Sequence, residues 1–231
     1  MASSAYVPAL AYPFLTRWYD AVVRWTTRER RFRALLLGQM DVRPGQQVLD
    51  VGCGTGTFAL MLKQAQPAAR IVGLDGDAAV LDLARRKAAA AGAEIDWRHG
   101  SALNQPFPDD SFDLAASSLV FHHLDRAAKR AALREIHRVL KPGGALHVAD
   151  WGRAANGLMR VAFLSVQALD GFGNTADNVA GLLPDFMREA GFADAREIRR
   201  LATPCGTLSI YRAAKPATPV RPAAPSRRQD P

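Results

Sequence analysis

Long apolar runs and cysteines are both scarce in this sequence. No run approaches the ~18 apolar residues in succession that a membrane-spanning helix needs. The first residues contain Pro8 and Pro13 but no basic leader, so we expect no signal peptide. Two cysteines, Cys53 and Cys205, are too few for a disulfide framework. We therefore expect the protein in the reducing cytoplasm.

Acidic residues are outnumbered, and the excess of positive charge is local. The chain has 30 Lys and Arg against 22 Asp and Glu, for a net charge of +8. Six arginines gather between Arg17 and Arg33, where only Asp20 and Glu29 oppose them. This cluster is either the solvated face of a helix or a contact for an anionic partner, such as a membrane surface or an acidic substrate. The segment Lys215–Pro231 is rich in Pro, Ala and Arg, and we expect it to be disordered.

A glycine-rich turn lies between a short apolar strand and a helix. The segment Gln47–Thr57 reads QVLDVGCGTGT, and apolar residues with helical character follow it. Gly52, Gly54 and Gly56 would let a ligand approach bare backbone, and the N–H groups at the start of the helix would point toward that ligand. The spacing is G-x-G-x-G, which differs from the G-x-G-x-x-G of dinucleotide-binding proteins.

Strands and helices alternate through the next hundred residues. We expect strands at 48–51, 70–74, 94–97, 112–116 and 145–149, with helices beginning after Asp77 and Asp125. Such alternation predicts a parallel sheet with right-handed crossovers. Beyond residue 153 the pattern changes to two helices, 158–169 and 179–190, and then to a hairpin of two strands, 193–201 and 207–213.

The order of five segments gives a family resemblance. The stretches VLDVGCGTG, IVGLD, GSALNQPFPDDSFD, SSLVFHHL and LREIHRVLKPGGALHVAD resemble S-adenosylmethionine (SAM)-dependent methyltransferases of the ubiquinone/menaquinone C-methyltransferase-like superfamily (types 11 and 25). The resemblance implies the Rossmann-like α/β fold of class I: seven strands, mostly parallel with the last antiparallel, and helices on both faces. It also implies a helical lid at 1–45, a catalytic domain at 46–213 with a helical substrate cap at 154–190, and a tail at 214–231.

The same resemblance implies a set of cofactor-binding residues. Asp75, at the end of the second strand, would accept hydrogen bonds from both ribose hydroxyls, and Asp50 would orient the methionine amino group. Ser101 stands where the family usually has an acid near the adenine. The full expected set is Asp50, Gly52, Cys53, Gly54, Gly56, Asp75, Gly76, Ser101, Ala102 and Ser117.

Two histidines follow the fourth strand. His122 is the candidate catalytic residue, because an imidazole near the site can deprotonate a hydroxyl or amine acceptor at neutral pH. A structural role in a helix-entry loop is the alternative for both histidines. Alignment alone can also accelerate methyl transfer, since the sulfonium is already activated. We expect no metal site, because the five histidines are scattered.

These patterns predict a SAM-dependent methyltransferase (EC 2.1.1.-) that acts on a small molecule, with the acceptor atom (O, N or C) undetermined. The segment SSLVFHH lacks the Pro-Pro-aromatic sequence of methyltransferases that act on nucleic-acid bases, so we expect no nucleic-acid partner. A membrane-associated lipid or quinone methyltransferase is one alternative, because the Arg-rich entry helix suits an anionic membrane. A SAM-binding regulatory subunit without turnover is another.

Overall fold

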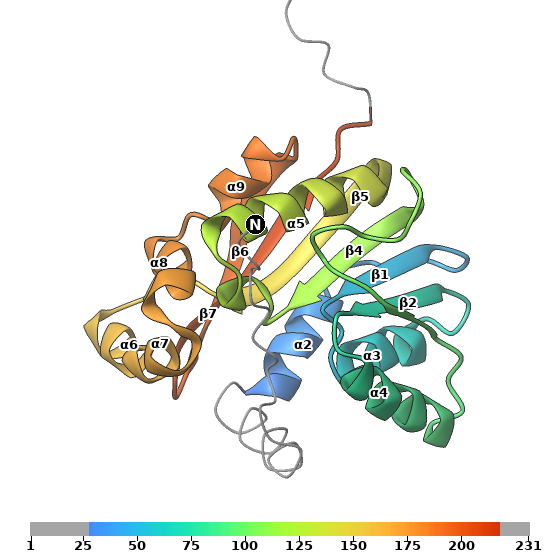
Figure 1. Ribbon diagram of the computed structural model, residues 1–231, viewed down its shortest axis with the longest axis horizontal. Coiled ribbons are helices and arrows are strands. Elements are labelled where there is room, and N and C mark those ends of the chain that lie inside the picture. Colours follow the sequence, from blue (N-terminus) through green and yellow to red (C-terminus); the bar gives the residue numbers. More distant parts are fainter. Residues whose placement is uncertain (1–27, 218–231) are drawn as a thin grey trace, which may run out of the picture.

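Seven strands form one sheet in the order β3-β2-β1-β4-β5-β7-β6. The structure is a computed structural model that describes residues 28–217 (Figure 1). The strands are β1 Gln47–Val51, β2 Arg70–Asp75, β3 Asp96–His99, β4 Phe112–Ser118, β5 Leu140–Trp151, β6 Ala193–Thr203 and β7 Gly206–Ala214. The first five are mutually parallel, and β7 runs antiparallel to both β5 and β6. The expected fold, with its antiparallel last strand, is confirmed.

Helices cover both faces of the sheet. They are α2 Glu29–Leu37, α3 Thr57–Ala65, α4 Ala78–Ala90, α5 Arg126–Val139, α6 Gly157–Ala162, α7 Leu164–Asp170, α8 Phe172–Ala180 and α9 Leu183–Glu189, together with the short 3₁₀ helix η2 Phe121–His123. In Figure 1, α5 and α9 lie on one side of the sheet and α2, α3 and α4 on the other. One apolar core packs α5 and α9 against the sheet, and a second packs α2 and α3 against its other face.

The two expected helix starts are confirmed by their caps. The Asp77 carboxylate accepts a hydrogen bond from the backbone N–H of Ala79 at 2.8 Å, at the start of α4. Asp125 accepts one from the N–H of Ala128 at 2.8 Å, at the start of α5. Each cap satisfies one of the N–H groups that the first turn of a helix leaves without an internal partner.

The region between β5 and β6 departs from the expected pair of helices. It contains four short helices: α6 and α7 meet at Phe163, and Gly181 takes a left-handed φ of 75° between α8 and α9, inside the expected helix 179–190. Helix α8 begins at Phe172, inside a segment that we expected to be a loop. The third strand also lies two residues further on than expected, and the fifth begins at Leu140 rather than Ala145.

Lys215 is held to the domain, although we expected it in the tail. Its Nζ donates to the Asp110 carboxylate and to the carbonyl of Leu140, both at 2.7 Å, and its backbone pairs with Gly143 and Gly144. The expected lid before residue 28 and the tail after residue 217 lie outside the described residues. No helix within 28–217 is long and apolar enough to cross a membrane.

Candidate cofactor and acceptor site

The parallel pairing of β1 and β2 brings two acids to the same edge of the sheet. Asp50 is in register with Gly73, and Asp75 ends β2 two residues later. Beyond β1, the backbone N–H groups of Gly52 and Cys53 both donate to the carbonyl of Leu74, at 2.8 and 3.0 Å. The glycine turn is therefore tied to the carboxyl end of β2, where ligands bind in open α/β sheets.

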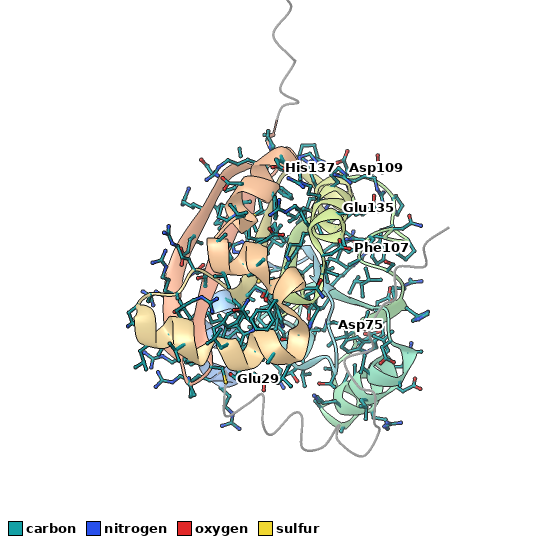
Figure 2. The ribbon with its side chains drawn as sticks, turned by 60° about the vertical axis from the view of Figure 1, so that its left-hand side comes forward. Glu29, Asp75, Phe107, Asp109, Glu135 and His137 are labelled. Atoms are coloured by element: carbon teal, nitrogen blue, oxygen red, sulfur yellow. The ribbon has the colours of Figure 1, made fainter. Side chains whose placement is uncertain are left out.

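Asp75 is positioned by two backbone N–H groups. One carboxylate oxygen accepts from Gly54 and the other from Asp77, at 2.8 and 2.9 Å. Burial raises the pKa of Asp75, and these two N–H groups oppose that shift. Each oxygen keeps a second lone pair, so the carboxylate can also accept from two neighbouring hydroxyls. In Figure 2, Asp75 lies below Asp109, Glu135 and His137, which are labelled toward the top of the molecule.

The three glycines of the turn have different surroundings. A Cβ on Gly52 would lie 2.3 Å from the Val120 side chain, and one on Gly56 would lie 2.4 Å from the Trp97 ring. A Cβ on Gly54 would meet nothing within 4 Å. Gly52 and Gly56 thus make room for neighbouring side chains of the protein itself. Gly54 is the glycine of the turn whose open side can face a ligand.

Asp50 is a buried carboxyl group without a hydrogen-bonding partner. It is 0% exposed, and neither of its oxygens accepts a hydrogen bond within the described residues. Burial, with the charge of Asp75, raises the pKa of Asp50 to about 7, although the charge of Arg33 and the nearby backbone N–H of Ala59 act in the opposite direction. A buried carboxylate with two unused oxygens is suited to a cationic hydrogen-bond donor such as an ammonium group.

Cys53 and Ser117 lie beside these acids. Cys53 is buried, and burial together with the charges of Asp50 and Asp75 raises the pKa of its thiol, which favours the uncharged form. Ser117 is paired in register with Val51 at the end of β4, and its buried hydroxyl has no partner among the described residues. Both residues are therefore near the glycine turn, as expected.

Ser101, Ala102 and Gly76 lie in the loops that follow β2 and β3. The Ser101 hydroxyl is exposed and accepts from the N–H of Leu103 at 3.1 Å, so it organises its own turn. Ala102 packs against the core on one face of the sheet. The carbonyl of Gly76 lies 3.0 Å from Nε2 of His99, which ties the loop after β2 to the end of β3.

His122 forms a buried pair with Asp150, the acid near the end of β5. Its Nδ1 lies 2.8 Å from a carboxylate oxygen of Asp150. Asp150 also accepts from the backbone N–H groups of Val120, Phe121 and Trp151 at 2.7–3.1 Å. Although burial acts to raise it, the pKa of Asp150 lies below its ordinary value because His122 and these N–H groups favour the carboxylate. Since a carboxylate only accepts, Nδ1 of His122 is the donor, and a neutral ring has its lone pair on Nε2.

A second acid faces these histidines from the end of α7. Asp170 lies 3.6 Å from Nε2 of His122 and 3.5 Å from Nδ1 of His123. Burial raises the pKa of Asp170, opposed by His122. Within residues 28–217, these three side chains form the group whose donor atoms are close enough together to hold a metal ion. This grouping could not be predicted from the sequence, because Asp170 is 47 residues from His123 in the chain.

Asp150 and Asp170 are the residues of the site that we did not anticipate. Asp150 could have been found from the sequence, because it is an acid near the end of an apolar strand, as Asp50 and Asp75 are. Asp170 could not, since its position depends on how α7 packs.

The strand order, the antiparallel β7 and the acids that end β1 and β2 together define a class I methyltransferase fold. A family profile described as "Methyltransferase domain" matches residues 48–144. The demethylmenaquinone methyltransferase of Thermus thermophilus is 41% identical over 133 residues, which cover 58% of this chain and 56% of that protein. The 2-phytyl-1,4-naphthoquinone methyltransferase of Synechococcus elongatus is 36% identical over 134 residues, covering 57% of each.

A solved structure agrees with the fold. The YcgJ protein of Bacillus subtilis superimposes with a TM-score of 0.64 at 20% identity, covering 81% of this chain and 99% of that one. The chain spans little more than half the length of the two curated relatives. Residues 48–144 are therefore similar in sequence to SAM-dependent methyltransferases, and the fold is that of class I. The residues fit the cofactor of SAM-dependent methyltransferases, because Asp50 has no hydrogen-bonding partner within residues 28–217, Gly54 is open, and Asp75 has lone pairs for a diol.

Proposed function

We propose that this protein transfers a methyl group from SAM to a small-molecule acceptor. The observation that supports this most strongly is the position of Asp50 and Asp75 near the carboxyl ends of the neighbouring strands β1 and β2, with Asp75 bound to the glycine turn. Asp75 would hold the ribose diol, and Asp50 the ammonium group of the methionine portion. When bound, SAM supplies an activated methyl group on a sulfonium. The protein's task is then to align an acceptor with that group.

His122 is the proposed catalytic residue on the acceptor side. The contact between Val120 and Gly52 joins the segment that carries His122 to the glycine turn. Asp150 holds the imidazole by Nδ1, so that Nε2 can take a proton from a hydroxyl or amine of the acceptor. Asp150 also stabilises the imidazolium that this transfer creates. Asp170 lies close enough to receive the proton afterwards.

An apolar ring compound of the quinone class is the acceptor that we propose. The two curated relatives are named as a demethylmenaquinone methyltransferase and a 2-phytyl-1,4-naphthoquinone methyltransferase. Helices α6–α8 expose several large apolar side chains beside the proposed acceptor side: Leu158, Val161, Leu164, Leu169 and Phe172. Such a surface suits a substrate with a hydrocarbon tail.

The same exposed side chains favour a second candidate, a methyltransferase that works at a membrane surface. Leu169 is 87% exposed and Leu158 is 72% exposed, which is unusual for apolar side chains on a helix that faces water alone. Sedimentation with anionic and with neutral vesicles separates the two candidates. Only the second predicts that the protein sediments with anionic vesicles and that added salt reduces the bound fraction.

For the compartment we propose the reducing cytoplasm, which is consistent with two free thiols, Cys53 and Cys205.

A transfer assay with labelled SAM tests the proposal. The full chain is incubated with reduced naphthoquinones with and without an isoprenoid tail, and S-adenosylhomocysteine and methylated product are measured. We expect product only with SAM, and faster with the tailed acceptor. Binding of S-adenosylhomocysteine without turnover on any acceptor in a metabolite library would instead support a regulatory subunit.

A further inference from the structure

His122, His123 and Asp170 bring three potential metal-binding groups together. One carboxylate oxygen of Asp170 lies 3.6 Å from Nε2 of His122, and the other lies 3.5 Å from Nδ1 of His123. Both separations exceed the ~2.7–3.2 Å of an N–H···O hydrogen bond. Within residues 28–217, the donor atoms of this group all lie within 4.8 Å of one another. The three side chains are therefore neighbours at distances longer than hydrogen bonds.

The two nitrogen–oxygen separations are those of neighbouring ligands around one zinc ion. Zinc binds imidazole nitrogen and carboxylate oxygen at ~2.0–2.2 Å and prefers a tetrahedral arrangement. Ligand atoms placed ~2.1 Å from a tetrahedral centre are about 3.4 Å apart. The observed 3.5 and 3.6 Å are close to this value. The group thus has the spacing of a metal site with three protein ligands, which leaves a fourth position open.

His122 already has the orientation of a metal-binding histidine. Its Nδ1 donates to Asp150 at 2.8 Å, which leaves the lone pair on Nε2, the atom that faces Asp170. Metal-binding histidines almost always donate their other ring N–H to a carboxylate or a carbonyl in this way. Asp150 is itself held by the backbone N–H groups of Val120 and Phe121. This pair therefore fixes the tautomer that a metal ion needs.

Solvent reaches the group from the side of His123. The side chain of His122 is 5% exposed, whereas those of Asp170 and His123 are 22% and 39% exposed. Asp170 is the last residue of α7, and His122 and His123 end the short helix η2. Both elements present their donors to the same place, and an ion can enter past His123 to reach Nε2 of His122.

We propose that His122, His123 and Asp170 bind a divalent transition-metal ion such as zinc, and that the bound ion inhibits methyl transfer. The inhibition rests on the proposed function, in which Nε2 of His122 accepts a proton from the acceptor. A metal ion on Nε2 uses the same lone pair, so the loaded protein loses this base. Imidazole ligands favour zinc, nickel or copper, whereas magnesium prefers oxygen ligands.

This site differs from the expectation that the sequence gives no metal site. That expectation depended on the scatter of the five histidines along the chain. His122 and His123 are adjacent, however, and the third ligand comes from α7. A site with ligands from two separate elements leaves no spacing pattern in the sequence.

Zinc is the probe that tests the site. The full chain is dialysed against EDTA, freed of EDTA, and titrated calorimetrically with zinc chloride in the absence of SAM and acceptor. Transfer rates are then measured over the same range of zinc concentration. We expect one zinc ion per chain, and a rate that falls at least about tenfold as the site fills. Magnesium should do neither, and zinc should leave the affinity for S-adenosylhomocysteine unchanged.

His123→Asn removes one ligand from the exposed side of the site. We expect it to lower the affinity for zinc at least about tenfold, to raise the half-inhibitory zinc concentration equally, and to keep a near-normal rate without metal. Asp170→Asn should also lower the affinity for zinc, and it provides the comparison if His123→Asn unfolds. Cys205→Ser is the matched control, because it removes a thiol that lies outside the group and should change neither quantity.

Zinc binding that His123→Asn and Asp170→Asn leave unchanged would overturn the site. A rate that rises or stays constant when the site is full would overturn the inhibition. If the metal-free chain transfers no methyl group to any acceptor, the proposed function fails, and calorimetry alone decides the metal site.

Discussion

Nδ1 of His122 and a carboxylate oxygen of Asp150 lie 2.8 Å apart, and both side chains are buried. This contact joins the segment after β4 to the end of β5, and it fixes which imidazole nitrogen is available to an acceptor. If Nε2 is the base, His122→Asn should lower kcat about 10²- to 10⁴-fold and leave SAM affinity unchanged. Steady-state kinetics measures kcat, and calorimetric titration measures the affinity for SAM.

His123→Asn is the control for this prediction, because its ring contacts Asp170 from the exposed side. Dialysis against EDTA is the second control. We expect it to leave the rate unchanged, since His122 acts as a base. A rate that depends on added metal would assign His122, His123 and Asp170 to a metal ion instead. Near-normal turnover in both histidine variants would show that alignment alone drives the reaction.

Asp75→Ala should lower the affinity for SAM about 10- to 100-fold, because hydrogen bonds to a charged acceptor contribute ~1.5–3 kcal/mol. The loss should be similar for 5′-methylthioadenosine, which has the same ribose. Calorimetric titration of both ligands measures it. An unchanged affinity would mean that the ribose hydroxyls bind elsewhere.

Asp50 should make SAM binding depend on pH. Its pKa is raised to about 7 in the folded protein, against ~3.9 for a free aspartate. Between these values the folded protein holds a proton that the unfolded chain has released, so Asp50 lowers the free energy of unfolding as pH rises from about 4 to about 7. The ligand ammonium favours the ionised form. Binding below pH 7 should therefore release close to one proton, and affinity should rise up to tenfold per pH unit.

Calorimetry in buffers of different ionisation enthalpy counts that proton. Asp50→Asn should bind SAM weakly and without proton release. The substitution should also raise the free energy of unfolding, and this gain should be larger at pH 8 than at pH 5. Proton release that persists in Asp50→Asn would assign the titration to another group.

Glycine substitutions should separate packing from ligand access. Gly52→Ala places a Cβ 2.3 Å from Val120, so it should lower the melting temperature by several degrees. Gly54→Ala and Gly92→Ala share a positive φ and an open side, so both should cost ~1 kcal/mol of backbone strain. Only Gly54→Ala should also lower the affinity for SAM. Equal SAM affinities in the Gly54 and Gly92 variants would place the ligand away from the turn.

The sequence was most informative where local rules decide the structure. Asp77 and Asp125 cap helices as expected, and the acids that end β1 and β2 lie together because parallel strands end at one edge. Helices α6–α9 were less predictable, because breaks at Phe163 and Gly181 divide apolar patterns that would suit longer helices. The partners of His122 depend on tertiary packing, since Asp150 and Asp170 reach it from β5 and α7. Gly52 and Gly56 show that glycines in a binding turn can serve packing instead of the ligand.

Binding of the cofactor tests the central claim most directly. S-adenosylhomocysteine is titrated into the folded full chain by calorimetry, alone and in the presence of excess NAD. We predict one site per chain, with an affinity that NAD does not reduce and that Asp75→Ala reduces at least tenfold. Folded protein that binds NAD but neither SAM nor S-adenosylhomocysteine would contradict the assignment of this site.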